Sequence, residues 1–146
     1  MRDDCVFCGI ASGKLSAHTV FENEQLIAFL DLNPIRPGHT QIIPKVHIPY
    51  FDHAPMEVLM PIVMLGQKLA TAIKTHLSVP RVAFLFTGGD IPHLHAHVVP
   101  MHEKTDITSR QYIVEDIVTF RDAPRMQRDA LEAVAADLRR ALADTA

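Results

Sequence analysis

Histidine and apolar residues alternate over the segment 93–99, and this pattern restricts the fold more than any other part of the sequence. Successive side chains of a β-strand point to opposite faces, so Leu94, Ala96 and Val98 share one face and His93, His95 and His97 the other. The apolar face belongs to a hydrophobic core. The segment therefore predicts a strand, His93–Val99, that lies in a sheet with one buried face.

Other short runs of β-type residues, bounded by turn signals, predict four more strands. The polar segment 23–25 separates the first two and is typical of a hairpin, and Gly88 and Gly89 form a turn between the last two. The four predicted strands are Thr19–Glu22, Leu26–Asp31, His39–Pro44 and Arg81–Thr87.

Apolar residues at intervals of three and four predict a central helix, Pro55–Leu77, and a C-terminal helix, Pro124–Ala143, capped by Asp122. Pro61 lies inside the first pattern, so this helix either kinks there or begins later. The first half of the central helix is apolar nearly all round and must be covered on two sides. A second copy of the chain is one way to cover it.

The composition is that of one soluble globular domain, residues 1–146, with 48% hydrophobic residues, 21% charged residues and a net charge of -3. Without a basic excess, we expect no binding to nucleic acid. The longest apolar run, Val58–Leu65, is far shorter than the roughly 20 residues that cross a bilayer, so we expect no membrane span. The N-terminus lacks the features of a signal peptide, which predicts a cytoplasmic protein.

The two cysteines, Cys5 and Cys8, are separated by two residues. In a reducing compartment, this spacing favours a metal or redox pair over a structural disulfide.

The three alternating histidines predict chemistry at phosphorus. At about 3.4 Å per residue, the outer two are roughly 13 Å apart along a strand, so at most two of the three can bind one metal ion. A neutral imidazole is a good nucleophile near pH 7, and its neighbours can hold its tautomer or neutralise phosphate oxygens. Three solvated histidines on an edge strand are the alternative without a function.

The same segment resembles the H-φ-H-φ-H-φ-φ signature, where φ is apolar, of the histidine triad (HIT) nucleotide hydrolases and transferases. The resemblance extends over about two thirds of the chain, from Cys5 to Pro100. It is carried by three further segments in the order and spacing of the family: Cys5–Ile10, Leu26–Pro34 and Pro37–His47.

This resemblance implies an α+β, HIT-like fold, in which a central and a C-terminal helix pack on a five-stranded antiparallel sheet. It also implies a homodimer formed through the central helix. The implied activity is hydrolysis or transfer at the α-phosphorus of a nucleoside phosphoramidate, an acyl-nucleotide or a dinucleoside polyphosphate. A purine nucleotide or nucleotide conjugate would be the ligand.

The family's catalytic roles transfer to three histidines of this chain. His95 would be the nucleophile that forms a nucleotidyl intermediate, His97 would bind the α-phosphate or the leaving atom, and His39 would help to fix tautomers. The implied nucleotide-binding residues besides His95 and His97 are Asp31 for the ribose, Phe29 and Leu32 for the base, and Thr87, Gly88 and Gly89 for the phosphate.

Family members that begin with such a cysteine pair resemble a zinc-binding subgroup. The four implied ligands are Cys5, Cys8, His47 and His93. A closed set of two cysteines and two histidines is typical of structural zinc, because no ligand position is left for water. We therefore expect the zinc to be structural and not catalytic.

Two alternatives remain at this stage. Asp90 stands where the family often has a serine or threonine that donates to the leaving group, and an ionised carboxylate cannot donate. The chain could therefore be a nucleotide-binding regulator with little turnover. It could also be a metal-dependent β-barrel of the cupin kind, with His95, His97 and Glu103 as ligands.

Overall fold

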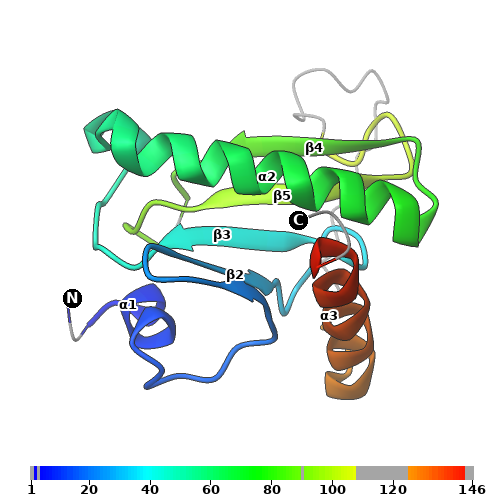
Figure 1. The fold of residues 1–146 in the computed structure, drawn as a ribbon, viewed down its shortest axis with the longest axis horizontal. Coiled ribbons are helices and arrows are strands. Elements are labelled where there is room, and N and C mark those ends of the chain that lie inside the picture. Colours follow the sequence, from blue (N-terminus) through cyan, green and yellow to red (C-terminus); the bar gives the residue numbers. More distant parts are fainter. Residues whose placement is uncertain (1, 3, 90, 108–124, 144–146) are drawn as a thin grey trace, which may run out of the picture.

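The strands form one antiparallel sheet in the order β1-β2-β3-β5-β4 (Figure 1). The computed structural model describes residues 2, 4–89, 91–107 and 125–143. The strands are β1 (Thr19–Glu22), β2 (Leu26–Leu30), β3 (Thr40–Pro44), β4 (Arg81–Phe86) and β5 (Ala96–Met101), and the helices are α1 (Val6–Ala11), α2 (Met56–Leu77) and α3 (Arg128–Ala143) with a 3₁₀ turn, η1, at Phe51–His53. The predicted α+β class with five antiparallel strands is confirmed, and the small all-β barrel is excluded.

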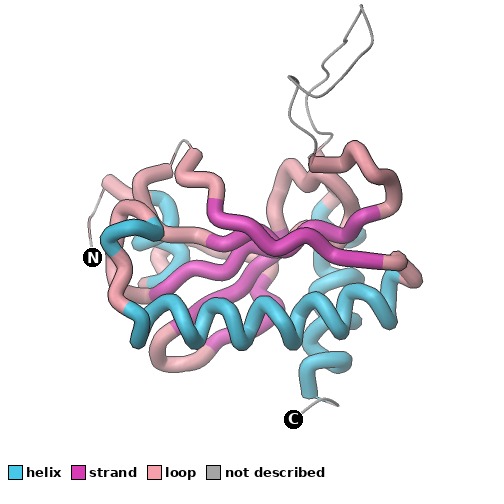
Figure 2. Tube along the Cα trace, turned by 90° about the horizontal axis from the view of Figure 1, so that it is seen from above, coloured by secondary structure: helices cyan, strands magenta, loops and turns pink. Residues whose placement is uncertain are grey.

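The two faces of the sheet are covered differently. Along β2, Ala28 and Leu30 belong to the large core that includes α2 and α3, whereas Ile27 and Phe29 pack with Phe7 of α1 in a smaller core. Figure 2 shows α2 lying along one side of the strands. One face is therefore closed by two long helices, whereas α1 is the only helix on the other face among the described residues, and this face is available for a site.

The last predicted strand is shifted along the chain, because β5 begins at Ala96 instead of His93 and ends at Met101 instead of Val99. The backbone N–H of Leu94 donates to the carbonyl of Ile48 (2.6 Å) and that of His93 to the carbonyl of Ile91 (2.8 Å), so this part of the segment bonds outside the sheet. The predicted division of faces still holds, because Leu94, Ala96 and Val98 all lie in the large core.

Three other strand ends differ from the prediction by one residue. Asp31, His39 and Thr87 lie just outside the strands β2, β3 and β4. The end of β2 and the start of β3 lie side by side, because the backbone N–H of Asp31 donates to the carbonyl of His39 (2.9 Å).

The helix α1 was not expected. It has only six residues, too few to show helical periodicity, and it begins where the Cys5 thiol accepts the backbone N–H of Cys8 (3.4 Å). It places both cysteines and Phe7 on the open face of the sheet.

The helix α2 begins at Met56, one residue after the predicted start, and continues through Pro61, so this proline does not delay the start of the helix. By length and composition alone, α2 could span a membrane, which the short apolar run did not suggest. In the fold, however, Ile62, Leu69 and Ile73 are completely buried in the large core, as in the core helix of a globular domain. The last helix, α3, begins at Arg128 and not at the predicted Pro124, because residues 125–127 are described and are not helical. Pro124 itself and the predicted cap, Asp122, lie outside the described residues.

Candidate functional site

The three alternating histidines join two different groups of side chains on the open face of the sheet. His93 faces the two cysteines, and His97 faces His39. His95 lies between them, with its ring centroid 4.9 Å from that of His97. The ring of Phe7 from α1 makes T-shaped contacts with the rings of both His93 and His95.

The first group, the cysteine–histidine cluster, consists of Cys5, Cys8, His47 and His93, whose four ligand atoms lie within 4.8 Å of one another. The Cys8 Sγ atom is 3.3 Å from the Nδ1 atom of His47 and 3.6 Å from that of His93. The Cys5 Sγ atom is 3.4 Å from the same His93 nitrogen. The structure thus brings together all four predicted metal ligands.

The donor set and its spacing fit zinc. Tetrahedral zinc with bonds of about 2.3 Å to sulfur and about 2.0–2.1 Å to nitrogen separates these atoms by roughly 3.6 Å. The His93 Nε2–H donates to the carbonyl of Pro44 (2.9 Å), which leaves Nδ1 with a lone pair directed toward the thiols. Two thiols and two imidazoles can therefore close around one cation.

Burial favours the neutral forms of three of these four side chains, Cys8, His47 and His93. It raises the pKa of the Cys8 thiol and lowers the pKa values of His93 and His47. Neutral imidazoles are ready to bind a metal, and the thiols need a cation to stabilise their thiolate form.

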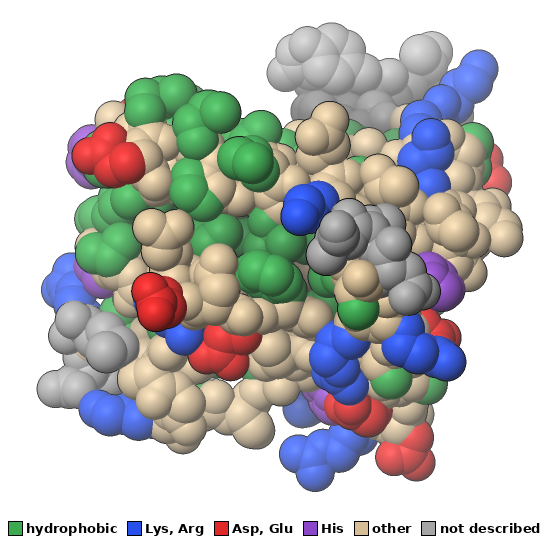
Figure 3. Space-filling view, viewed as in Figure 1, with side chains coloured by type: hydrophobic (Ala, Val, Ile, Leu, Met, Phe, Trp, Pro, Cys, Tyr) green, Lys and Arg blue, Asp and Glu red, His purple; other side chains and the backbone are tan. Residues whose placement is uncertain are grey.

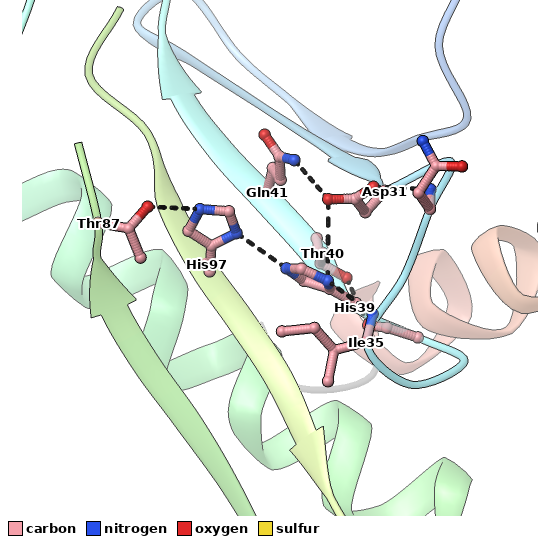
Figure 4. Close-up of polar contacts among 9 residues, drawn as sticks. Asp31, Ile35, His39, Thr40, Gln41, Thr87 and His97 are labelled. Atoms are coloured by element: carbon pink, nitrogen blue, oxygen red, sulfur yellow. Dashed lines mark hydrogen bonds and ion pairs between the residues drawn. The ribbon is translucent and has the colours of Figure 1, made fainter. Parts of the chain in front are cut away.

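The second group is a chain of hydrogen bonds, the histidine chain, through Ile35, His39, His97 and Thr87 (Figure 4). The Ile35 backbone N–H donates to His39 Nδ1 (3.3 Å), so the ring proton of a neutral His39 is on Nε2. That proton is donated to His97 Nδ1 (2.9 Å), and the His97 Nε2–H is then donated to the hydroxyl oxygen of Thr87 (3.1 Å). Because Thr87 accepts in this chain, its own O–H is free to donate to a ligand.

Both histidines of the chain are neutral near pH 7. Burial lowers the pKa of His39, and burial together with His39 and His95 lowers the pKa of His97 to about 4. The separation of 3.8 Å between His39 Nδ1 and the Asp31 carboxylate is therefore not an ion pair.

His95 is buried and its tautomer is fixed. Its Nδ1–H donates to the backbone carbonyl of His93 (2.6 Å), which leaves a lone pair on Nε2. Within the described part of the chain, Nε2 has no hydrogen-bond partner. This arrangement is what a nucleophilic imidazole needs.

Asp31 lies beside the histidine chain with both carboxylate oxygens oriented. Oδ1 accepts the backbone N–H of Asn33 (2.8 Å), and Oδ2 accepts the side-chain Nε2–H of Gln41 (2.6 Å). The carboxylate retains further lone pairs for a ligand.

The remaining predicted residues are not all in one place. Phe29 is buried against Phe7, with ring centroids 5.7 Å apart, whereas Leu32 lines a cavity of about 700 Å³ next to the start of α3. Gly88 and Gly89 are exposed after the end of β4, and Gly88 has a φ of 61°, which favours glycine. Asp90 lies outside the described residues.

Sequence reasoning missed two residues of the site, Phe7 and Gln41. Phe7 belongs to the unexpected helix α1. Gln41 could have been noticed as the polar residue before two isoleucines in β3, where its side chain shares the open face with Phe29 and His97.

Comparisons of sequence relate the chain to one group of proteins. A family model described as HIT domain matches residues 12–104. An uncharacterised HIT-like protein of Mycoplasma genitalium is 34% identical over 104 residues, which are 68% of this chain and 74% of that protein. The cysteines and α3 lie outside the matched family model.

The similarity to solved structures also includes the cysteines and α3. A zinc-bound histidine triad family protein from Mycobacterium smegmatis has a TM-score of 0.76 at 30% identity and covers 97% of this chain and 95% of its own. A HIT family hydrolase from Legionella pneumophila has a TM-score of 0.62 at 34% identity, over 68% of this chain and 95% of its own.

Proposed function

The chain belongs to the HIT domain family, a superfamily of nucleotide-binding hydrolases and transferases, and on this premise we propose that it acts at the α-phosphorus of nucleotide conjugates through His95. The substrates would be nucleoside phosphoramidates, acyl-nucleotides or dinucleoside polyphosphates. The intermediate would be a nucleotidyl group bound covalently to His95.

The observation that carries the proposal is the state of the His95 ring. Nδ1 donates to the His93 carbonyl, and Nε2 keeps a lone pair with no partner in the described structure. The neighbouring rings of His97 and His39 are neutral at pH 7 because of their lowered pKa values. They therefore place no positive charge beside the His95 lone pair that would weaken it as a nucleophile.

The reaction has two displacements. In the first, the Nε2 lone pair of His95 forms a bond to phosphorus, and the bond to the leaving group breaks with its electron pair, which takes up a proton from solvent. In the second, water attacks phosphorus, the P–N bond breaks and its electron pair returns to Nε2, while the proton of the water goes to solvent. A transferase would use another acceptor in place of water.

The histidine chain would orient the donors around the phosphate. Thr87 accepts from His97, so its O–H points to a ligand oxygen or to the leaving atom. The exposed backbone amides of Gly88 and Gly89 would add donors to the α-phosphate, Asp31 would accept from the ribose, and Phe29 and Leu32 would contact the base.

Cys5, Cys8, His47 and His93 would hold a structural zinc ion. A bound zinc ion would connect three parts of the chain: α1 with its two cysteines, the segment after β3 and the segment before β5. The His93 side chain would then be fixed by the metal and by the Pro44 carbonyl, and its own carbonyl would hold His95 in place.

We propose a homodimer formed through the outer face of α2. Figure 3 shows hydrophobic side chains gathered over the N-terminal half of this helix. Met56, Met60, Val63 and Met64 recur at helical spacing and are 43–61% exposed, and Phe84 of β4 is also exposed. An apolar face of this kind is typical of an interface between copies.

Sedimentation velocity tests the dimer. We expect wild-type protein at twice the 16.3 kDa mass of the chain, and Met64→Glu at the monomer mass, because a charge cannot be buried unpaired at the interface. Ala130→Glu adds the same charge at an exposed position of α3, away from this face, and should remain dimeric. A monomeric wild type would contradict the proposal.

We also propose a cytoplasmic location. The free thiols of Cys5 and Cys8 support it, because such thiols persist in reducing compartments.

The release of AMP from adenosine 5′-phosphoramidate tests the function directly. We expect wild-type protein to release AMP and His95→Asn to lose roughly a thousandfold or more of the rate while still binding nucleotide. His53→Asn makes the same substitution at an exposed histidine of η1 and should keep full activity. Equal rates for wild type and His95→Asn would remove His95 from this role.

A regulator with little turnover gives a different result in the same assay. Wild-type protein that binds AMP tightly but releases none from the phosphoramidate would favour this second function over catalysis.

A further inference from the structure

Gln41 occupies the position between the predicted ribose ligand and the histidine chain. In the sheet it is the register partner of Phe29 on β2 and of His97 on β5, so its side chain stands in the centre of the open face. Its Nε2 atom is 2.6 Å from Oδ2 of Asp31, a short bond to a charged acceptor. Figure 4 shows the amide nitrogen turned toward Asp31 and the amide oxygen turned away.

The amide oxygen of Gln41 is buried and has no hydrogen-bond partner in the described structure. Buried polar atoms are nearly always paired, and an unpaired acceptor destabilises the folded chain. Turning the amide over does not remove the problem, because it would place the oxygen against the Asp31 carboxylate. The folded chain therefore tolerates an unsatisfied oxygen in order to direct a donor at Asp31.

This donor completes the orientation of the carboxylate. The Asn33 backbone N–H holds Oδ1 of Asp31 and Gln41 holds Oδ2, so each oxygen has one protein donor and retains a lone pair. A carboxylate held in this way can accept two hydroxyl groups side by side, as a ribose diol presents them. Without Gln41, the backbone bond to Oδ1 would be the only hydrogen bond from the described residues that restrains it.

We propose that Gln41 is a positioning residue for ribose specificity, which fixes the Asp31 carboxylate so that it accepts both hydroxyl groups of a nucleotide ribose. The inference rests on the proposed function, since it requires a nucleotide ligand. It adds a residue that determines specificity for the sugar, and this residue acts through Asp31 and not through the reacting histidines.

Binding of AMP, 2′-deoxy-AMP and 3′-deoxy-AMP, measured by calorimetry, tests the inference. We expect wild-type protein to bind AMP about tenfold or more tightly than either deoxynucleotide, as is usual for a hydrogen bond to a charged group. In Gln41→Leu, the preference should fall to within about threefold, because AMP binding weakens while deoxynucleotide binding changes little. Gln25→Leu makes the same substitution at an exposed site and should keep the wild-type preference.

A merely structural role for Gln41 predicts other results. Damage to the pocket would weaken AMP and both deoxynucleotides by the same factor, which leaves the preference unchanged and overturns the inference. The melting temperature gives a second readout: we expect Gln41→Leu to melt no lower than wild type, because the unpaired oxygen is removed together with the donor. Melting well below wild type would show that the glutamine is kept for stability.

The two proposals fail in distinguishable ways. Wild-type protein that binds none of the three nucleotides would overturn the proposed function and this inference with it. Wild-type protein that prefers AMP, with the same preference in Gln41→Leu, would overturn the inference alone.

Discussion

The cysteine–histidine cluster and the histidine chain lie on the same face of the sheet but use their ring nitrogens in different ways. In the cluster, Nδ1 of His47 and Nδ1 of His93 both point at thiol sulfur atoms, and the four ligand atoms converge on one point. In the chain, each ring nitrogen of His39 and His97 has its own hydrogen-bond partner.

The difference shows why the residue type alone does not assign a role to a histidine. Asp31, His39 and His97 also lie close enough together to suggest a metal site. However, the imidazole lone pairs of His39 and His97 already accept N–H donors, and a cation would have to break the bond between the two rings. Convergent lone pairs favour a metal, whereas a directed series of donors and acceptors favours the orientation of a proton.

One residue joins the cysteine–histidine cluster to the proposed nucleophile. The side chain of His93 belongs to the cysteine–histidine cluster, and its carbonyl accepts the Nδ1–H of His95. If metal binding fixes His93, it also fixes the tautomer of the proposed nucleophile.

Breaking the cluster should have the largest effect. We expect Cys8→Ser to lose bound zinc and several kcal/mol of stability, because metal binding contributes directly to folding. AMP release should also fall, since His95 loses a fixed support. Metal content by atomic absorption and unfolding by urea measure these changes.

Ser12→Ala serves as the control for this substitution, because it alters an exposed hydroxyl next to α1 without touching the cluster. If Cys8→Ser kept the metal content and stability of wild type, the cluster would not be a zinc site. Loss of zinc without loss of AMP release would break the link through His93.

The sequence predicted the sheet better than the site because local signals determine strands. β1 agrees at both ends, since the polar segment 23–25 marks the turn and alternation marks the strands. β5 was placed too early because the bond between Leu94 and Ile48 is a contact between distant segments. No local pattern contains such a contact.

The metal ligands illustrate the same limit. Spacing alone suggested a metal or redox role for Cys5 and Cys8, but His47 and His93 are far away in sequence and were assigned through the family resemblance. The orientation of each ring depends on partners such as the Pro44 carbonyl, which are visible only in the fold. Gln41 was missed because its bond to Asp31 joins β3 to the end of the neighbouring strand β2, and no local pattern contains such a contact.

Acid should lower the free energy of unfolding through the histidine chain, by less than the loss of the cysteine–histidine cluster does. The pKa of His97 is about 4 in the folded protein and about 6.5 in the unfolded chain, so the unfolded chain binds more protons between these values. This contribution to stability is complete above pH 6.5 and is lost as the pH falls toward 4, by up to about 3 kcal/mol at 1.36 kcal/mol per pH unit. The groups that face His97 are His39, His95 and Asp31, and His39, whose pKa is also lowered, acts in the same direction.

Replacing His97 separates its share of this pH dependence from that of the cysteine–histidine cluster, whose histidines also resist protonation. We expect the free energy of unfolding, measured in urea from pH 7 to pH 4.5, to fall less steeply in His97→Gln than in wild type. His53→Gln removes an exposed histidine and should follow the wild-type curve. Parallel curves for His97→Gln and wild type would mean that His97 titrates equally in the folded and unfolded states, and the chain would then not be held neutral by burial.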